Sequence, residues 1–249
     1  VDMPLTAADR GSAIHAALGE FTTRFAAELP DDIADALRKI GHKHFAPLME
    51  RPEARALWWP RFLRIADWFS GWEARRRLDV SRVDAEIRGE IPIQLGNGRT
   101  FVLSARADRI EHRTDHTYAI LDYKTGAAPS QKQVDTGFSP QLTLTAAILM
   151  NGGFPDLGRP APGDLTYVRV TGRRPAGEEQ VRALAGDEAS AAATKALEGL
   201  SGLIARYDDP DEPYRSRVAP QFVKEHPGDY AHLARVFEWS TSGDDGEGE

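Results

Sequence analysis

The fold of this chain is most constrained by three stretches in which apolar and polar residues alternate: residues 83–95, 99–108 and 117–124. Alternation with a period of two is typical of strands that bury one face. The first two stretches are separated by Gly96-Asn97-Gly98, and Asn-Gly between such stretches is a strong β-hairpin signal. We therefore expect an antiparallel meander of three strands.

Helical patterns flank this meander on both sides. Before it, apolar residues recur at helical spacing in residues 9–29, 31–50 and 53–78, with Asp9 as a candidate N-cap of the first helix. After it, we expect a helix at 139–151, a strand at 164–171, an Ala-rich helix at 186–207 and a short helix at about 228–235. The order helix, three-strand meander, helix, strand predicts an α/β chain of the α+β type.

The segment 53–78 carries large apolar residues at spacings of three and four, which marks one helix face: Trp58, Phe62, Ile65, Phe69 and Trp72. This regularity favours packing in the core or against a partner, and stacking of the aromatic rings on bases is the alternative. The segment also carries five arginines that either face DNA or form a solvated surface: Arg61, Arg64, Arg75, Arg76 and Arg77.

A pair of charged residues interrupts the apolar strand that ends the meander. Asp122 and Lys124 share one strand face, roughly 7 Å apart, and a charge in such surroundings is costly unless something compensates it. Asp108, at the end of the second strand, could supply another carboxylate, and two carboxylates with a substrate phosphate can hold Mg²⁺. Lys124 would then orient or deprotonate a water and offset charge on the phosphate. The alternatives are an exposed Asp–Lys pair and a salt bridge from Asp108 to Arg106 or Arg109.

Composition limits the kinds of site that the chain can form. It contains no cysteine, which excludes disulfides, thiolate zinc sites and cysteine-ligated iron–sulfur clusters. The formal net charge is −7, although DNA-binding proteins gain affinity by neutralising phosphates. Eight of the acids lie in two runs, 208–212 and 244–249, and without them the charge is +1. We therefore expect a short, metal-centred contact with DNA, with further grip supplied by a partner.

Membrane and motor functions find no support in the sequence. No run of 18 or more uncharged apolar residues occurs, and no basic region followed by an apolar stretch opens the chain, so we expect no membrane contact and a cytoplasmic location. Lys124-Thr125 does not end a Walker A motif, because the two glycines would fall at positions 118 and 123, which are both Tyr.

The site residues, taken in order, resemble a known nuclease family. Asp108 followed by Asp122-x-Lys124, with Gly11-Ser12-Ala13-Ile14-His15 on a preceding helix and Gln141 after them, is similar to the RecB-type branch of the PD-(D/E)xK nuclease superfamily. Within it, the chain is most similar to the C-terminal nuclease domain of AddB proteins, including their closing segment, here residues 230–240. The resemblance implies a restriction-endonuclease-like αβββαβ core with a mixed sheet and an N-terminal helical extension.

The resemblance also implies which residues are catalytic. Asp108 and Asp122 match the acidic residues of the motif, and Lys124 matches the catalytic lysine, for which a simple ion pair is the alternative. Gln141 matches the glutamine that opens a helical Gln-x-x-x-Tyr motif. The chain departs from that motif because position 145 is Thr, which removes the contact of a tyrosine ring, expected to be with the DNA strand.

A metal site is implied as well. Its ligands would be His15, Asp108, Asp122 and the backbone carbonyl of Tyr123, with Glu86 as a carboxylate behind them or at a second metal. Without the resemblance, His15 would be interpreted as an ordinary core or surface histidine. The implied cofactor is Mg²⁺ or Mn²⁺, and an imidazole ligand favours Mn²⁺ in affinity.

We therefore expect a metal-dependent deoxyribonuclease, an exonuclease in action, that serves double-strand break repair within an AddAB/RecBCD-type helicase-nuclease. Its partners would be DNA, as a single-stranded end or an unwound strand, and a helicase-nuclease subunit of AddA type. The alternative is a nuclease-inactive domain of the same complex that binds DNA or acts as a scaffold. We expect one domain over residues 1–240, with a helical insertion at 30–80 and core elements at 83–208, followed by a disordered acidic tail at 241–249.

Overall fold

The computed structural model describes residues 6–96, 98–183 and 187–213. Its centre is a five-stranded sheet in the order β1-β2-β3-β4-β5, formed by β1 (Val80–Gln94), β2 (Thr100–Arg113), β3 (Tyr118–Lys124), β4 (Pro162–Val170) and β5 (Gly177–Ala183). Strands β3 and β4 are parallel and the other neighbours are antiparallel. The three-strand meander and the mixed sheet are thus confirmed.

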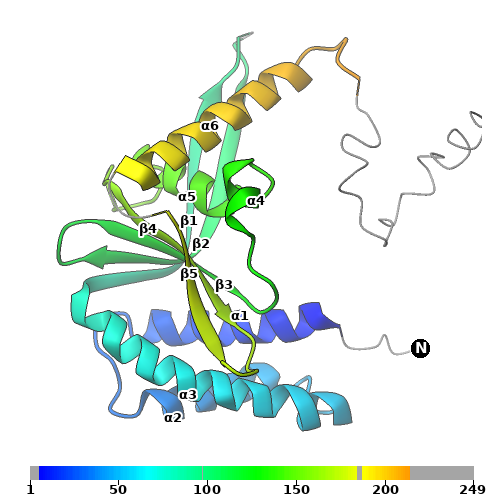
Figure 1. Cartoon of the computed structure of the whole chain (residues 1–249), viewed down its shortest axis with the longest axis vertical. Helices are drawn as coiled ribbons and strands as arrows, with labels where there is room; N and C mark the ends of the chain where they lie inside the picture. Colours follow the sequence, from blue (N-terminus) through cyan, green and yellow to red (C-terminus); the bar gives the residue numbers. More distant parts are fainter. Residues whose placement is uncertain (1–5, 97, 184–186, 214–249) are drawn as a thin grey trace, which may run out of the picture. The chain divides into compact units, whose positions relative to one another are not determined.

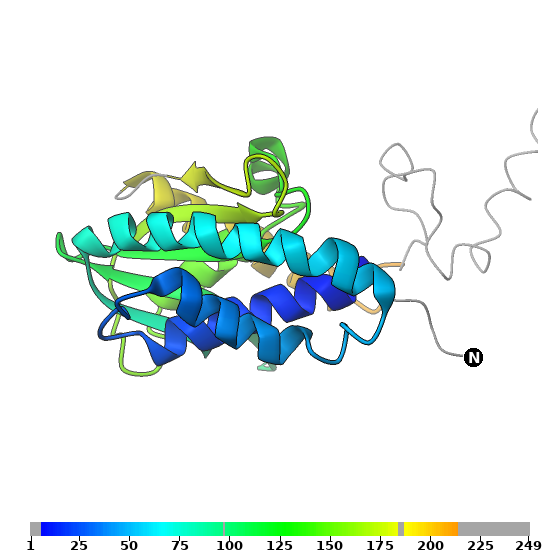
Figure 2. The same ribbon diagram turned by 90° about the horizontal axis from the view of Figure 1, so that it is seen from below.

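Helices cover both faces of this sheet (Figure 1). One face carries α1 (Ala7–Arg24), α2 (Ile33–Phe45) and α3 (Trp59–Arg76), which Figure 2 shows together in front of the strands. A π-helix, η1 (Ala54–Trp58), leads into α3, and a 3-10 turn, η2 (Arg77–Asp79), follows it. The other face carries α4 (Gln131–Asp135), α5 (Gln141–Met150) and the first part of α6 (Asp187–Tyr207).

The strand alternation divides the apolar residues between two cores. Leu121 and Tyr123 pack toward α1–α3, whereas Ile120 and Tyr167 pack toward α4 and α5. The aromatic stripe of α3 belongs to the first core, with Phe62, Ile65 and Phe69 fully buried and Trp72 nearly so. This burial confirms the packing interpretation of the stripe and removes these residues from contact with bases.

Helix α1 begins and ends earlier than the sequence pattern indicates. The N-cap is Thr6 rather than Asp9; Asp9 is the acidic partner of a capping box, and its carboxylate accepts a hydrogen bond from the Thr6 amide at 2.7 Å. The helix ends at Arg24, and the next two carbonyls, of Phe25 and Ala26, accept hydrogen bonds from the guanidinium of Arg77. The apolar residues Ile14, Leu18 and Phe21 of this helix are nevertheless buried.

Two elements of the sheet region were not predicted. Strand β5 pairs along β4 at the edge of the sheet, and α4 occupies five residues between β3 and α5. Helix α5 begins with Gln141, two residues later than expected, and Pro140 is its N-cap. Gln141 is therefore the first residue of α5, at its N-terminal end.

The chain divides into two compact units, residues 1–202 and 203–249. Every candidate site residue lies in the first unit. In the described part of the chain, the helices are too short or too polar to cross a membrane. The predicted short helix at 228–235 and the acidic tail at 241–249 fall outside the described residues.

Candidate active site

The candidate site lies where strands β2 and β3 separate. Their ladder pairs Arg109 with Leu121 and goes no further in that direction. One residue beyond, the Asp108 carboxylate accepts a hydrogen bond from the backbone amide of Tyr123 at 2.9 Å. A side chain therefore replaces a strand-to-strand bond here, and it fixes one carboxylate in the fork between the two strands.

Asp122, Lys124 and Gln141 meet on the α5 side of this fork. The ammonium nitrogen of Lys124 lies 2.5 Å from Asp122 Oδ2 and donates a hydrogen bond to Gln141 Oε1 at 2.8 Å. The Asp122 side chain is 6% exposed and that of Lys124 is 26% exposed. The structure thus gathers three of the four predicted catalytic side chains and leaves the lysine accessible.

The two carboxylates are short of positive charge. Burial and the nearby charge of Asp108 raise the pKa of Asp122 to about 6, and Lys124 offsets only part of this shift. Asp122 Oδ2 is buried, and its close polar partner among the described residues is the Lys124 ammonium. A buried carboxylate oxygen with so little compensation fits contact with a cation.

His15 and Glu86 lie on the other side of Asp108, along a groove between α1 and the first two strands. His15 Nδ1 is 3.5 Å from Asp108 Oδ2, and a third of the ring is exposed. Glu86 pairs with Arg106 at 2.8 Å, yet burial and the charge of Asp108 raise its pKa. Gly19 of α1 makes room for this acid, because a Cβ there would lie 2.6 Å from Glu86 Oε1.

The salt-bridge alternative for Asp108 is wrong. Arg106 pairs with Glu86, and the fully buried Arg109 pairs with Glu73 at 2.7 Å and with Glu111 at 2.8 Å. Among the residues that the structure describes, Asp108 forms an ion pair with neither arginine. Its carboxylate is held by the Tyr123 amide and faces His15.

The donor set suits a hard divalent cation. Asp108 and Asp122 offer carboxylate oxygens, and His15 offers an imidazole nitrogen next to Asp108. No three His, Asp or Glu side chains within the described ranges converge as a ready-made metal site. The joint ligation by His15, Asp108, Asp122 and the Tyr123 carbonyl therefore stays a prediction. It is supported by the raised pKa of the buried Asp122 carboxyl, for which the Lys124 ammonium compensates only in part.

Tyr167 is a site neighbour that the sequence analysis missed. It lies directly opposite Asp122 in the parallel pairing of β3 and β4. The Lys124 ammonium is 5.4 Å from its ring centroid, and its buried hydroxyl has no hydrogen-bond partner in the described structure. Burial, with the charge of Asp122, raises its pKa to about 12, against the effect of Arg182. An aromatic residue in an apolar strand is usual, so the sequence did not indicate that Tyr167 lies beside Asp122 and Lys124.

Thr145 explains how the chain departs from the Gln-x-x-x-Tyr motif. Its hydroxyl donates a hydrogen bond to the carbonyl of Gln141 at 2.8 Å, one turn earlier in α5, and the residue is 4% exposed. The position therefore faces the protein interior. An aromatic contact with a bound strand cannot come from it.

Comparison with known proteins yields one family-level match. The model of the PD-(D/E)XK nuclease superfamily matches residues 1–218. Uncharacterized proteins of Rickettsia bellii (strain RML369-C) and Rickettsia conorii are 28% and 27% identical to the chain over 146 and 150 residues. Each match covers 59% of this chain, which spans only 17–18% of the length of these relatives. A solved structure titled "Crystal structure of SSO0001" aligns with this chain at 12% identity and a TM-score of 0.34. The alignment covers 86% of this chain and 97% of the chain in that structure.

Proposed function

The chain belongs to the PD-(D/E)XK nuclease superfamily, and on that premise we propose that it is a metal-dependent, cytoplasmic DNA nuclease domain of an AddAB/RecBCD-type helicase-nuclease. The observation that carries the nuclease activity is the contact of Lys124 with both Asp122 and Gln141, beside a second carboxylate at Asp108. An ammonium group and two neighbouring acids provide the charges that phosphodiester hydrolysis requires.

Lys124 is suited to contact the reacting phosphate. Its ammonium group has three N–H donors; one bonds Gln141, and the group also contacts Asp122. The donor that remains is available for a phosphate oxygen or for the attacking water, where it would offset charge that develops in the transition state. Gln141 and the Tyr167 ring restrict where this ammonium can move.

Mg²⁺ or Mn²⁺ would be held by Asp108 and Asp122, with His15 and the Tyr123 carbonyl as further ligands, and would supply Lewis-acid activation of water and of the phosphodiester. Asp108 is already fixed by the Tyr123 amide, so it needs little rearrangement. Glu86 would add negative charge behind it. Lys124 supplies a single positive charge at the site, so a bound metal ion would neutralise most of the phosphate charge.

Single-turnover cleavage of labelled single-stranded DNA, with an EDTA control, tests the activity. Lys124→Ala should lower the cleavage rate roughly 10²-fold or more, because one electrostatic or acid–base group is removed, and should retain Mn²⁺ binding in calorimetry. Asp122→Ala should lose both. Lys132→Ala, at an exposed position of α4, is the matched control and should cleave normally.

Two outcomes would overturn this proposal. If Lys124→Ala cleaves at the wild-type rate, Lys124 has no part in the reaction. If the wild-type protein cleaves no faster with Mn²⁺ than with EDTA, the chain is a nuclease-inactive domain that binds DNA or supports a partner.

The role in a helicase-nuclease rests on the motif order and on the relatives, whose matched region is a small part of a longer protein. We expect the full-length protein to form a complex with an AddA-type subunit and to degrade linear duplex DNA when ATP is added. Exonuclease action predicts degradation of linear but not circular single-stranded DNA. Cleavage of both forms at equal rates would instead indicate an endonuclease.

A further inference from the structure

We propose that Arg10, Arg61 and Arg173 form a phosphate-binding site for the nucleic-acid strand that passes through the candidate active site. The proposal rests on the proposed nuclease function and extends it to the path of the substrate. The three arginines come from separate elements. Arg10 lies in the first turn of α1, Arg61 in the first turn of α3, and Arg173 in the turn between β4 and β5.

Packing at two points brings these elements together. The Arg10 guanidinium carbon lies 5.9 Å from the ring centroid of Trp58, which precedes Arg61 by one helical turn. Gly172 lies against the Arg61 backbone, because a Cβ on Gly172 would fall 2.3 Å from the Arg61 carbonyl oxygen. A positive φ of 63° at Gly172 allows this approach and turns the chain into Arg173.

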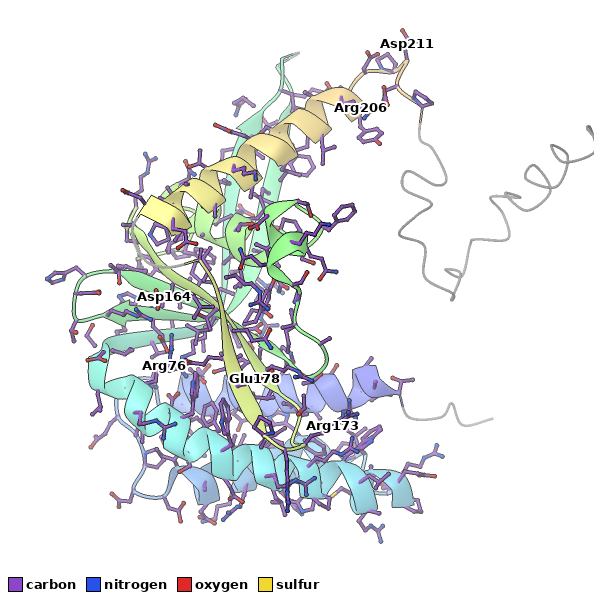
Figure 3. All side chains as sticks on the ribbon, viewed as in Figure 1. Arg76, Asp164, Arg173, Glu178, Arg206 and Asp211 are labelled. Carbon is purple, nitrogen blue, oxygen red and sulfur yellow. The ribbon has the colours of Figure 1, made fainter. Side chains whose placement is uncertain are left out.

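The turn that carries Arg173 is fixed against α3. Arg64 Nε, one turn after Arg61, donates a hydrogen bond to the Gly172 carbonyl at 2.7 Å. Figure 3 labels Arg173 at this turn, close to α3. Arg64 is therefore occupied with the backbone, whereas Arg61 and Arg173 are left to present their charges.

The three charges lack anionic partners in the part of the chain that the structure describes. Across residues 6–96, 98–183 and 187–213, none of the three guanidinium groups forms an ion pair. Burial and the positive charges of Arg61 and Arg173 lower the pKa of Arg10, so the groups repel one another. Repelling guanidiniums are stabilised by an anion that bonds them together, and their planar donors match phosphate oxygens.

The start of α1, which carries Arg10, packs against the residue that follows Lys124. Gly11 follows Arg10, and a Cβ on Gly11 would lie 3.1 Å from the hydroxyl oxygen of Thr125, the residue after Lys124. A strand with one phosphate at Lys124 would thus pass the start of α1, where Arg10 lies. The three arginines give the chain a local basic contact despite its net charge of −7.

Binding of the full chain to fluorescent single-stranded DNA in EDTA tests the proposal without cleavage. Arg173→Ala should weaken binding by roughly tenfold, the size expected for one charge-assisted contact. The slope of log K against log salt should fall in magnitude by about 0.7, the value for one phosphate of a single strand. Arg75→Ala, an exposed position about 20 Å further along α3, is the control and should change neither quantity.

The outcomes separate this site from the nuclease activity. Arg173 is exposed in a turn, so its substitution leaves the fold intact even where Arg10→Ala or Arg61→Ala does not. Unchanged affinity and salt slope for Arg173→Ala would overturn the phosphate site, whatever the cleavage rate. If Arg173→Ala binds DNA more weakly and the wild-type protein does not cleave DNA, the phosphate site is supported and the proposed nuclease activity is refuted.

Discussion

Two groups of charged residues on strands β2 and β3 and the helices beside them are balanced differently. On the α3 side, Arg109 belongs to a network of three arginines and three glutamates joined at 2.7–2.8 Å: Arg76 (labelled in Figure 3), Arg77, Arg109, Glu73, Glu111 and Glu179. In the candidate site, the Lys124 ammonium contacts Asp122 at 2.5 Å, whereas Asp108, whose charge raises the pKa of Asp122, faces His15. The first group is electrically complete, and the second has a carboxylate in excess.

The pKa shifts of two residues express this difference. Burial lowers the pKa of Arg109, but Tyr123, Glu111 and Glu73 outweigh it and raise the pKa well above its ordinary value. Burial raises the pKa of Asp122 to about 6, and Lys124 does not outweigh it. The network therefore favours the charged form of Arg109, whereas the candidate site disfavours the charged form of Asp122. A complete network stabilises the fold, and an incomplete one leaves a place for a cation.

The largest expected effect is on stability, from breaking the complete network. Arg109→Ala leaves Glu73 and Glu111 buried without their main partner and should lower the free energy of unfolding by about 3–5 kcal/mol. Urea denaturation measures this loss. Arg88→Ala, at an exposed position of the neighbouring strand β1, should change it by less than about 0.5 kcal/mol. A loss below about 1 kcal/mol for Arg109→Ala would show that the network stores little stability.

Removing the charge of Asp122 from the candidate site should raise the stability of the metal-free protein, the opposite of the effect expected for Arg109→Ala. Because the folded-state pKa of Asp122, about 6, exceeds its ordinary value of 3.8, the metal-free wild-type protein loses stability as the pH rises from about 4 to about 6. Asp122→Asn does not titrate there. At pH 7 to 8 in EDTA, the variant should be more stable than wild type by about 3 kcal/mol, and below about pH 4 the difference should vanish.

Urea denaturation of both proteins at several pH values checks this sign. Asp31→Asn, at an exposed position before α2, is the control and should show no pH-dependent difference. A variant that is less stable than wild type at pH 8 would mean that the ion pair with Lys124 outweighs the cost of burying the Asp122 charge.

The smallest expected effect concerns Tyr167. Its hydroxyl is buried without a hydrogen-bond partner among the described residues, so Tyr167→Phe should raise the free energy of unfolding by about 1 kcal/mol. The aromatic ring that faces Lys124 is kept. Thermal denaturation with a parallel cleavage assay separates two roles: unchanged cleavage assigns the function to the ring, and slower cleavage assigns one to the hydroxyl. A less stable variant would reveal a hydrogen bond that the phenol makes.

Local patterns account for most of what could be predicted of the fold. The meander and the helices around it follow from alternation and helical spacing within single segments, and those predicted within the described residues are present. Strand β5 was missed because most of its residues are polar and only Val181 and Ala183 are clearly apolar, as is possible for an edge strand that pairs with β4. Helix α4 was missed because five residues are too few for periodicity to be recognised.

The candidate site divides in the same way. Asp122 and Lys124 could be found because two residues of one strand share a face, and their contact is present. Tyr167 and the pairing of Arg109 with Glu73 depend on parallel strand pairing and on helix packing between distant segments. No spacing within a sequence window encodes such contacts, so they had to be read from the structure.

The hydrogen bond from the Tyr123 amide to Asp108 makes one backbone proton a reporter of the site. An amide bonded to a carboxylate is sensitive to the charge of that carboxylate, and its proton exchanges with solvent only when the bond opens. Divalent cation bound at Asp108 should therefore shift the Tyr123 amide resonance and change its exchange rate. The neighbouring amides within the β2–β3 ladder should be little affected. Occupancy can then be followed by NMR in the absence of DNA and of any turnover.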